Sequence, residues 1–341
     1  MNSDVKPSML DACFSVNDRG RQPLIKHLTF CLLCLCVALS AQANTRLYGY
    51  ANGFAQTRTV SDGTALEVTG YLTELGFRNS TPVTPELKAG FDLNLGLNLL
   101  DSWSPYMRRG DLSLEGRWGT VALFYGETPL SETNQWLTLM HQDPDNLPLA
   151  LDFAGASPLR LPQGVTAVDG LRYRTPLVGS RVQLSGALMP AEQIGGETGY
   201  SVTLSWLGEH FRSLAGIELN GAYGNAQLGR WINEYRSEAF TLGLLLQATH
   251  NTLTEAQGQS VMLYSQHPWS LGEQSQRLKL TLSANHFVDQ DDERRLAFYS
   301  SLVNQVVMSE SFSLYGFAEA KWESETPAFT LYTGAGASLG F

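Results

Sequence analysis

The chain ends in FTLYTGAGASLGF, residues 329–341, and apolar residues occupy nearly every second position of that stretch. One face carries Phe329, Leu331, Thr333, Ala335, Ala337 and Leu339. The opposite face carries Thr330, Tyr332, Gly334, Gly336, Ser338 and Gly340. A period of two residues is typical of a β-strand with one apolar face. The ending therefore predicts a strand, which fits either a soluble β-sandwich or a transmembrane β-barrel.

A second stretch, ELKAGFDLNLGLNLL at residues 86–100, favours the barrel. Its apolar face carries Leu87, Ala89, Phe91, Leu93, Leu95, Leu97 and Leu99. Its polar face carries Lys88, Gly90, Asp92, Asn94, Gly96 and Asn98. An uninterrupted apolar face suits lipid outside, and a charged, amide-bearing face suits water inside. A soluble sandwich gives the polar face no reason to be so rich in glycine.

Short alternating runs of this kind fill the chain from Asn44 onward and are separated by turn residues. The runs are 46–54, 66–79, 86–100, 108–117, 119–127, 168–174, 181–189, 200–208, 211–219, 226–235, 239–249, 259–266, 277–287, 295–307, 312–322 and 328–341. The total of sixteen is even, as bacterial single-chain barrels require. We therefore predict an all-β protein, a transmembrane antiparallel β-barrel of about sixteen strands, with residues 44–341 as its barrel domain.

The first 43 residues have a different pattern. Lys26 and His27 precede an apolar run that ends in the small residues Ala41 and Ala43, which is the layout of a secretory signal peptide cleaved before Asn44. The apolar run is too short for a membrane helix. We expect the 25 residues before Lys26 to reflect a mis-assigned start, with a cytoplasmic extension as the alternative.

The composition excludes several classes of function. All four cysteines lie within residues 1–43, so residues 44–341 offer neither a disulfide framework nor a cysteine metal site. We expect no metal and no cofactor. Residues 1–43 hold 4 of the 23 basic and 3 of the 33 acidic residues, which leaves a formal charge of −11 for the remainder. That excess of acid argues against a nucleic-acid partner.

The order of the segments resembles that of the trimeric general porins of Gram-negative outer membranes. The resemblance rests on RLYGYANGF at 46–54, RRGDLSLEGRWGTVALFYGETPL at 108–130 and VDGLRYRTPLVG at 168–179, and it covers about residues 46–188. It implies a water-filled channel for passive diffusion of ions and small hydrophilic solutes. It also implies a homotrimer in contact with outer-membrane lipid and lipopolysaccharide, and a C-terminal signal, Leu339 and Phe341, for the outer-membrane assembly machinery.

The resemblance further implies that residues 128–166, a proline-rich segment, form a third loop folded into the barrel to narrow the channel. Acidic residues of this loop would face arginines of the wall. The loop offers Glu132, Asp143, Asp145 and Asp152. The wall arginines map to Arg108 and Arg172. Strict alternation places Arg174 on the same face as Arg172, and it places Arg109 on the polar face in place of Arg108. A β-bulge would bring Arg108 inward, so both stay candidates.

Two positions depart from the family's pattern. Glu74 and Tyr125 stand where the family commonly has basic residues. Carboxylates in a channel favour cations, and arginines or lysines favour anions. We therefore hypothesise a channel that is less favourable to anions than those of its relatives, with Glu74, Arg78, Lys88 and Asp92 joining the arginines near the narrow zone. The alternative is that these charges form solvated pairs along a wide lumen.

Two other functions compete with the channel. A barrel-embedded hydrolase would need a nucleophile with a base or a metal site, and the histidines show no metal-ligand spacing. A structural or adhesive barrel would need the third loop to block the lumen. The acidic run at 289–293 could bind a divalent cation or form a solvated loop tip.

Overall fold

The computed structural model divides the chain into two units, Met1–Thr45 and Arg46–Phe341, and the description below concerns the second. The residues described are 45–60, 63–97, 105–133, 168–191, 197–221, 226–253, 255–272, 274–288, 291, 293–324 and 329–340. Among them, no helix is both long enough and apolar enough to cross a membrane.

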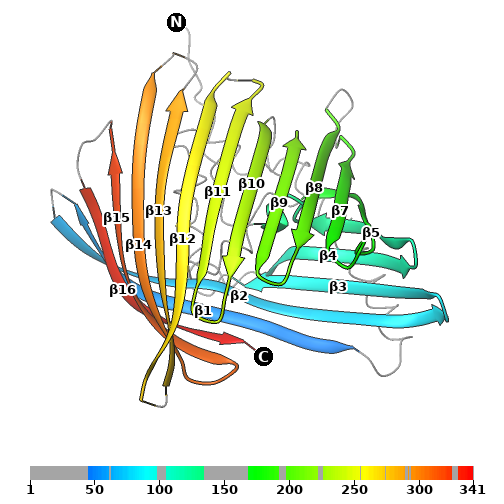
Figure 1. The fold of residues 1–341 in the computed structure, drawn as a ribbon, viewed down its shortest axis with the longest axis horizontal. Coiled ribbons are helices and arrows are strands. Elements are labelled where there is room, and N and C mark those ends of the chain that lie inside the picture. Colours follow the sequence, from blue (N-terminus) through cyan, green and yellow to red (C-terminus); the bar gives the residue numbers. More distant parts are fainter. Residues whose placement is uncertain are drawn as a thin grey trace, which may run out of the picture. The chain divides into compact units, whose positions relative to one another are not determined.

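Nearly all of these residues lie in strands, which Figure 1 shows side by side. The strands are β1 (Arg46–Val60), β2 (Gly63–Thr84), β3 (Leu87–Leu97), β4 (Pro105–Gly116), β5 (Gly119–Gly126), β6 (Val168–Arg174), β7 (Val182–Met189), β8 (Gly199–Leu207), β9 (Phe211–Leu219), β10 (Ala226–Arg236), β11 (Thr241–Asn251), β12 (Gln257–Leu271), β13 (Gln274–Val288), β14 (Arg294–Val307), β15 (Phe312–Glu323) and β16 (Phe329–Gly340). Each predicted run overlaps one strand, so the prediction of about sixteen strands is confirmed.

The sheet closes on itself. Every strand pairs antiparallel with its neighbour in sequence, and β1 also pairs with β16, for example at Ala55 with Ala335. Closure satisfies the backbone groups that an open sheet edge would leave without partners, which lipid does not tolerate.

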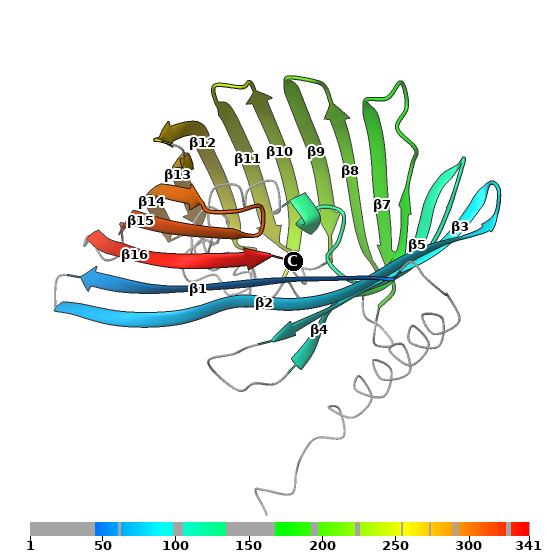
Figure 2. The ribbon, with the colours of Figure 1, turned by 90° about the horizontal axis from the view of Figure 1, so that it is seen from below.

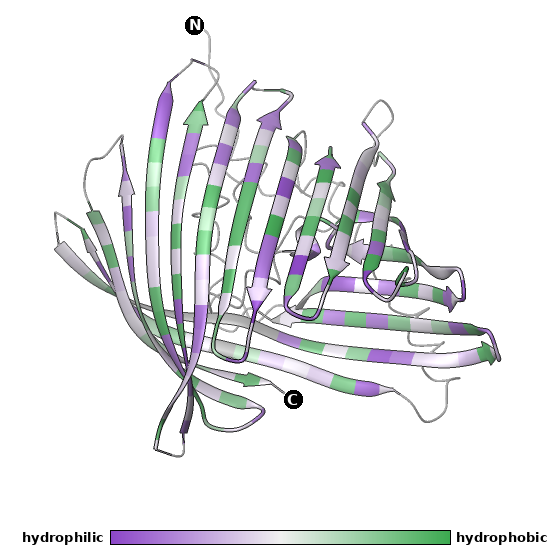
Figure 3. Cartoon of the chain, viewed as in Figure 1, coloured by the Kyte–Doolittle hydropathy of each residue, from purple (hydrophilic) through white to green (hydrophobic). Residues whose placement is uncertain are grey.

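The two faces of the wall differ in polarity. In β8, Tyr200, Val202 and Leu204 are exposed on the outer face, whereas Ser201 and Thr203 are buried on the inner face. The hydropathy colours alternate along most strands in the same way (Figure 3). Apolar residues outside and polar residues inside are the pattern of a barrel in lipid.

The connections differ in length between the two ends of the barrel. The end at which β1 begins and β16 finishes has the short connections 85–86, 117–118, 175–181, 208–210, 237–240, 272–273 and 308–311. The other end has the two-residue connection 61–62 and otherwise connections of five residues or more, including 98–104, 190–198 and above all 127–167. In bacterial outer-membrane barrels the short turns are periplasmic and the longer loops are extracellular.

Candidate functional site

An irregularity in the pairing of β4 with β3 decides which way the side chains of Arg108 and Arg109 point. Asn94 of β3 pairs with Arg109, but the next residue, Leu95, pairs with Met107, so Arg108 is the extra residue of a bulge. A bulge re-aims a side chain that strict alternation would send to the other face. Both arginines consequently form ion pairs with carboxylates of neighbouring strands.

Arg108 lies between two glutamates. Its guanidinium pairs with Glu74 of β2, and its Nη2 lies 3.7 Å from Oε1 of Glu127. Asn94 supports the same carboxylate, because its Nδ2 donates to Oε2 of Glu74 over 2.7 Å. Glu74 is thus held by a cation from β4 and an amide from β3.

Arg109 connects the next carboxylates. Its Nε donates to Oδ2 of Asp111 over 3.0 Å, and its Nη2 lies 3.4 Å from Oδ2 of Asp92. Tyr48 of β1 donates its hydroxyl to Oδ1 of Asp92 over 2.6 Å. Asp92 therefore joins β1 and β4 across the inner face.

Arg172 of β6 extends the chain of charges to the connection that follows β5. Its Nη2 lies 2.8 Å from Oδ2 of Asp111, and its Nη1 donates to Glu132. Nη2 of Arg174 donates to the second oxygen of Glu132 over 2.7 Å. Glu132 belongs to the short 3₁₀ turn η2 (Ser131–Thr133), so a residue of the predicted third loop contacts two predicted wall arginines.

We call this set the charged cluster: Glu74, Asp92, Arg108, Arg109, Asp111, Glu127, Glu132, Arg172 and Arg174. It has one more carboxylate than guanidinium. Burial varies within it: the side chains of Arg172 and Asp111 are 9% and 8% exposed, whereas that of Arg174 is 41% exposed. The cluster is therefore a partly buried set of ion pairs, in which Arg172 and Asp111 are the most buried members and Arg174 is the most exposed.

The segment before and within η2 is also held by β8–β10, the part of the wall that follows β7. Oγ1 of Thr128 donates to the buried Glu218 of β9, and the backbone nitrogen of Leu130 donates to Oγ of Ser201 of β8 over 3.1 Å. Nη1 of Arg230 of β10 donates to Oγ1 of Thr133 over 2.6 Å. Figure 2 shows the short coiled ribbon of η2 within the ring of strands.

Gln247 of β11 orients Arg230 in this contact. Its Oε1 accepts hydrogen bonds from Nε and Nη2 of Arg230, over 2.9 and 2.8 Å. Our sequence reading missed Ser201, Glu218, Arg230 and Gln247. The available signal was a charged residue on the inner face of an otherwise uncharged pattern, as at Glu218 and Arg230.

A second charged group lies further along the wall. Glu234 of β10 is fully buried and pairs with Arg236 and with Arg212, whose Nη2 lies 2.8 Å away. Tyr264 of β12 donates its hydroxyl to Glu234 over 3.1 Å. The sequence reading did not single out this group, whose Glu234 and Arg236 lie in β10, a strand of weak sequence alternation.

The remaining predicted residues border the charged cluster, lie further along the wall or fall outside the described residues. Arg78 is the cross-strand partner of Asp92, and its guanidinium carbon lies 5.4 Å from the ring centroid of Tyr48, whereas Lys88 forms an exposed pair with Glu115 at 3.6 Å. Leu339 is exposed on the outer face and pairs with Phe312. The predicted residues that lie outside the described part of the chain are Ala41, Ala43, Asp143, Asp145, Asp152 and Phe341.

In the part of the chain that the structure describes, no group of three or more histidine, cysteine, aspartate and glutamate side chains is arranged to hold a metal ion. The charged cluster instead satisfies its carboxylates with arginines.

No protein-family model matches this chain. No curated protein matches it either. Solved structures do. An anion-selective porin from Comamonas acidovorans aligns with a TM-score of 0.67 and 16% identity, over 87% of this chain and 99% of that one. The trimer form of OmpT, an outer membrane protein of Vibrio cholerae, aligns with a TM-score of 0.65 and 10% identity, over 88% and 100%.

A mutant of the Rhodopseudomonas blastica porin aligns with a TM-score of 0.61 and 13% identity, over 87% of this chain and 100% of that one. Sequence identities this low show only that the folds are similar. The chain is a closed barrel of sixteen antiparallel strands, with the fold of the outer-membrane β-barrels to which it is similar. Within that class its fold is porin-like.

Proposed function

We propose that this protein is a porin, a channel for passive diffusion of ions and small hydrophilic solutes, and that it is not an enzyme. The observation that carries the proposal is the double attachment of residues 128–133. Glu132 pairs with Arg172 and Arg174 of β6, while Thr128, Leu130 and Thr133 bond to β8–β10. A segment held to both parts of the wall supports a loop that narrows a lumen without filling it.

The net charge of the proposed constriction sets its preference for cations or anions. The charged cluster carries one more carboxylate than guanidinium, and Glu74 is one of those carboxylates. Carboxylates lining a pore favour cations. We therefore propose weak cation preference, in contrast to the Comamonas protein, which is named as anion-selective.

We also propose a homotrimer, with support from the OmpT structure, which is described as a trimer form. The assembly can be measured independently of conduction by mass photometry of the detergent-extracted protein. A single species of monomer mass would contradict it.

The channel is tested by planar-bilayer conductance of the purified protein under a salt gradient. Stable conductance steps with a reversal potential on the cation side are the expected result. Silence from correctly inserted protein would favour the alternative, a structural or adhesive barrel whose lumen the third loop blocks. Hydrolysis of peptide or lipid ester substrates by the same preparation, abolished by a point mutation in the barrel, would favour the embedded hydrolase.

A further inference from the structure

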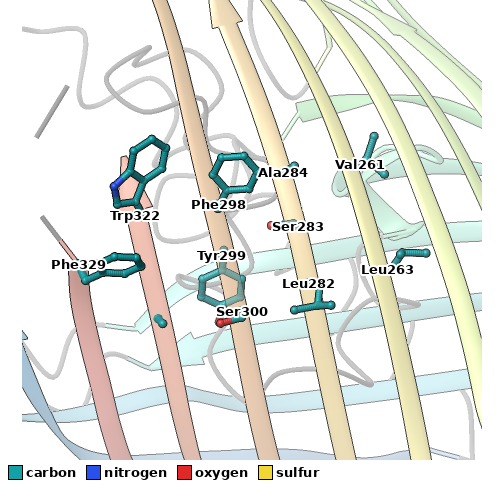
Figure 4. Close-up of a pocket in the computed structure, with 11 residues that line it drawn as sticks. Val261, Leu263, Leu282, Ser283, Ala284, Phe298, Tyr299, Ser300, Trp322 and Phe329 are labelled. Atoms are coloured by element: carbon teal, nitrogen blue, oxygen red, sulfur yellow. The ribbon is translucent and has the colours of Figure 1, made fainter. Parts of the chain in front are cut away.

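A buried lysine, Lys279, lies on the inner face of β13 and is 5% exposed. It shares that face with the buried Ser283, whereas Leu282 and Ala284 lie on the exposed outer face (Figure 4). Among the described residues, Lys279 has no hydrogen-bond or ion-pair partner. A desolvated cation without a counter-charge costs free energy. Its presence in the wall therefore points to a role other than stability.

Two amide oxygens without partners flank this lysine. Gln266 of β12 is its cross-strand neighbour. Gln305 of β14 is a diagonal neighbour, because Lys279 pairs with Val303, two residues before it. Diagonal neighbours are about 7–8 Å apart, which long side chains can span. Within the described ranges, Oε1 of Gln266 and Oε1 of Gln305 are buried and lack hydrogen-bond partners. One unmet cation thus lies between two unmet acceptors.

Further cations lie near this trio. Arg236 of β10 is in the same row of cross-strand partners, which runs Arg236, Thr241, Gln266 and Lys279. Arg236 and Arg212 share the carboxylate of Glu234, so these three side chains carry one net positive charge. Arg277, two residues before Lys279, is exposed. The inner wall around Lys279 therefore attracts anions.

The acids of this region lie outside the row. Glu319 of β15 is two strands from Lys279 and accepts a hydrogen bond from Oγ of Ser301 over 3.4 Å. Glu209 and Glu238 are exposed in the connections 208–210 and 237–240, at the end of the barrel. These carboxylates consequently leave the charge of Lys279 unbalanced.

We propose that Lys279, Gln266 and Gln305 bind a hydroxylated carboxylate of the sugar-acid class. The carboxylate of the ligand accepts hydrogen bonds from Lys279, and its hydroxyls donate to the two amide oxygens. A hydrogen bond between charged groups is roughly twice as strong as a neutral one, so the lysine is the main anchor. A neutral sugar lacks the charge, and a simple carboxylate lacks the hydroxyl donors.

This site is distinct from the charged cluster. It lies on β12–β14, whereas the charged cluster lies on β2–β6 and the connection that follows β5. The charged cluster would set the preference among small ions, and this site would retain one class of larger anion. The inference rests on the proposed function, because it gives the channel a solute class, but binding can be measured without conduction.

The first test is isothermal titration calorimetry of the folded, detergent-purified protein with D-gluconate. Lys279→Gln should bind gluconate about tenfold more weakly, and Gln266→Leu about fivefold more weakly. Lys321→Gln is the matched control, because Lys321 already pairs with Glu323 over 2.7 Å, and it should bind normally. All variants are compared only after heat-modified gel migration shows a folded barrel.

The second test separates the two halves of the recognition. D-Glucose offers the hydroxyls without the charge, and acetate offers the charge without the hydroxyls. Each should bind the wild-type protein at least about tenfold more weakly than gluconate. Lys279→Gln should lose most of the difference between gluconate and glucose, because that difference comes from the carboxylate.

The third test asks whether Lys279 serves stability. Without ligand, Lys279→Met should have a urea unfolding midpoint in lipid vesicles equal to or above that of the wild type, since it removes a desolvated charge. A lower midpoint would contradict the unbalanced charge on which the inference rests.

Three binding results overturn the proposal: no binding of gluconate by the wild type, unchanged gluconate affinity in Lys279→Gln, and equal affinities for gluconate, glucose and acetate. The outcome is separable from that of the proposed channel. Gluconate binding by a protein that gives no conductance would keep this site and reject the channel. Conductance without gluconate binding would keep the channel and reject this site.

Discussion

Glu74 is the residue through which the charge preference of the proposed channel can be tested most directly. It carries a negative charge within the charged cluster, beside Arg108. Glu74→Gln removes that charge and leaves the guanidinium in place. In water, a unit charge about 10 Å away shifts the energies of a cation and of an anion by about 0.4 kcal/mol each in opposite directions, so we expect the cation-to-anion permeability ratio to fall about fourfold.

The measurement is the reversal potential under a salt gradient. Glu115→Gln is the control, because Glu115 forms an exposed pair with Lys88 apart from the cluster. An identical reversal potential in wild type and Glu74→Gln would contradict the assignment of Glu74 to the conducting path.

Arg172 has a different role, because it is buried between two carboxylates. Its replacement leaves the buried Asp111 without one of its two cations and Glu132 with Arg174 alone. Removing one member of a buried ion pair leaves the other charge buried without its partner. We expect Arg172→Met to destabilise the barrel by about 3 kcal/mol.

Urea unfolding of the protein in lipid vesicles measures this loss. The double variant Arg172→Met with Asp111→Asn removes the stranded charge and should recover part of the stability. If the double variant is as unstable as the sum of the single changes, the two residues are not coupled as the geometry requires.

At the scale of an element, residues 128–133 illustrate how a connection is held inside a barrel. The turn η2 has few residues, and its fixed position depends on hydrogen bonds to Ser201, Glu218 and Arg230. Arg230 is 3% exposed and bonds both Thr133 and Gln247. A bond to a charged group contributes about 1.5–3 kcal/mol, so this one residue is a large part of the attachment.

We expect Arg230→Gln to loosen the start of the loop, with larger and noisier single-channel currents. The control is Arg277→Gln, an exposed arginine of β13. Single-channel recording at constant voltage compares the two. Currents of unchanged amplitude and noise in Arg230→Gln would show that this attachment does not shape the conducting path.

At the scale of the whole molecule, folding requires the first and last strands to meet. β1 and β16 pair from Tyr50 with Gly340 to Thr59 with Leu331. Contacts across nearly the whole chain form late and slowly, because closing so long a loop costs conformational entropy. Recognition of the C-terminal strand by the outer-membrane assembly machinery would therefore help the barrel to close.

The predicted C-terminal signal, Leu339 and Phe341, is tested on that basis. Deleting Phe341 should lower the amount of barrel in the outer membrane several-fold, while refolding of the purified chain in detergent stays unchanged. Fractionation with quantitative immunoblotting measures the first quantity and heat-modified migration the second. Loss of refolding in detergent would instead assign Phe341 a structural role.

Much of the fold was predictable because its signal is local. Alternation within 46–54, 211–219 or 312–322 depends only on residues next to each other, and a barrel wall imposes it on every strand. Even the weak run 226–235 proved to be a strand, β10, because its neighbours on both sides bind it into the sheet.

The site was predictable only in part. Glu132 and Arg172 were named as candidates from the resemblance and Arg174 from alternation, and the structure places the two arginines in contact with Glu132. Strict alternation could not choose between Arg108 and Arg109, because a bulge is set by pairing with β3 and leaves no period in the sequence. Lys88 was grouped with them, yet its described ion pair is with Glu115.

The sequence by itself determined the strands, their number and which face of each meets lipid, since a two-residue period carries all of that information. Only the tertiary structure decided which charges meet. Thr128 and Glu218 are 90 positions apart, and Arg230 reaches Thr133 across 97. Such partners come together because the curved sheet places the inner faces of β9 and β10 within reach of the connection that follows β5, and no local pattern records that geometry.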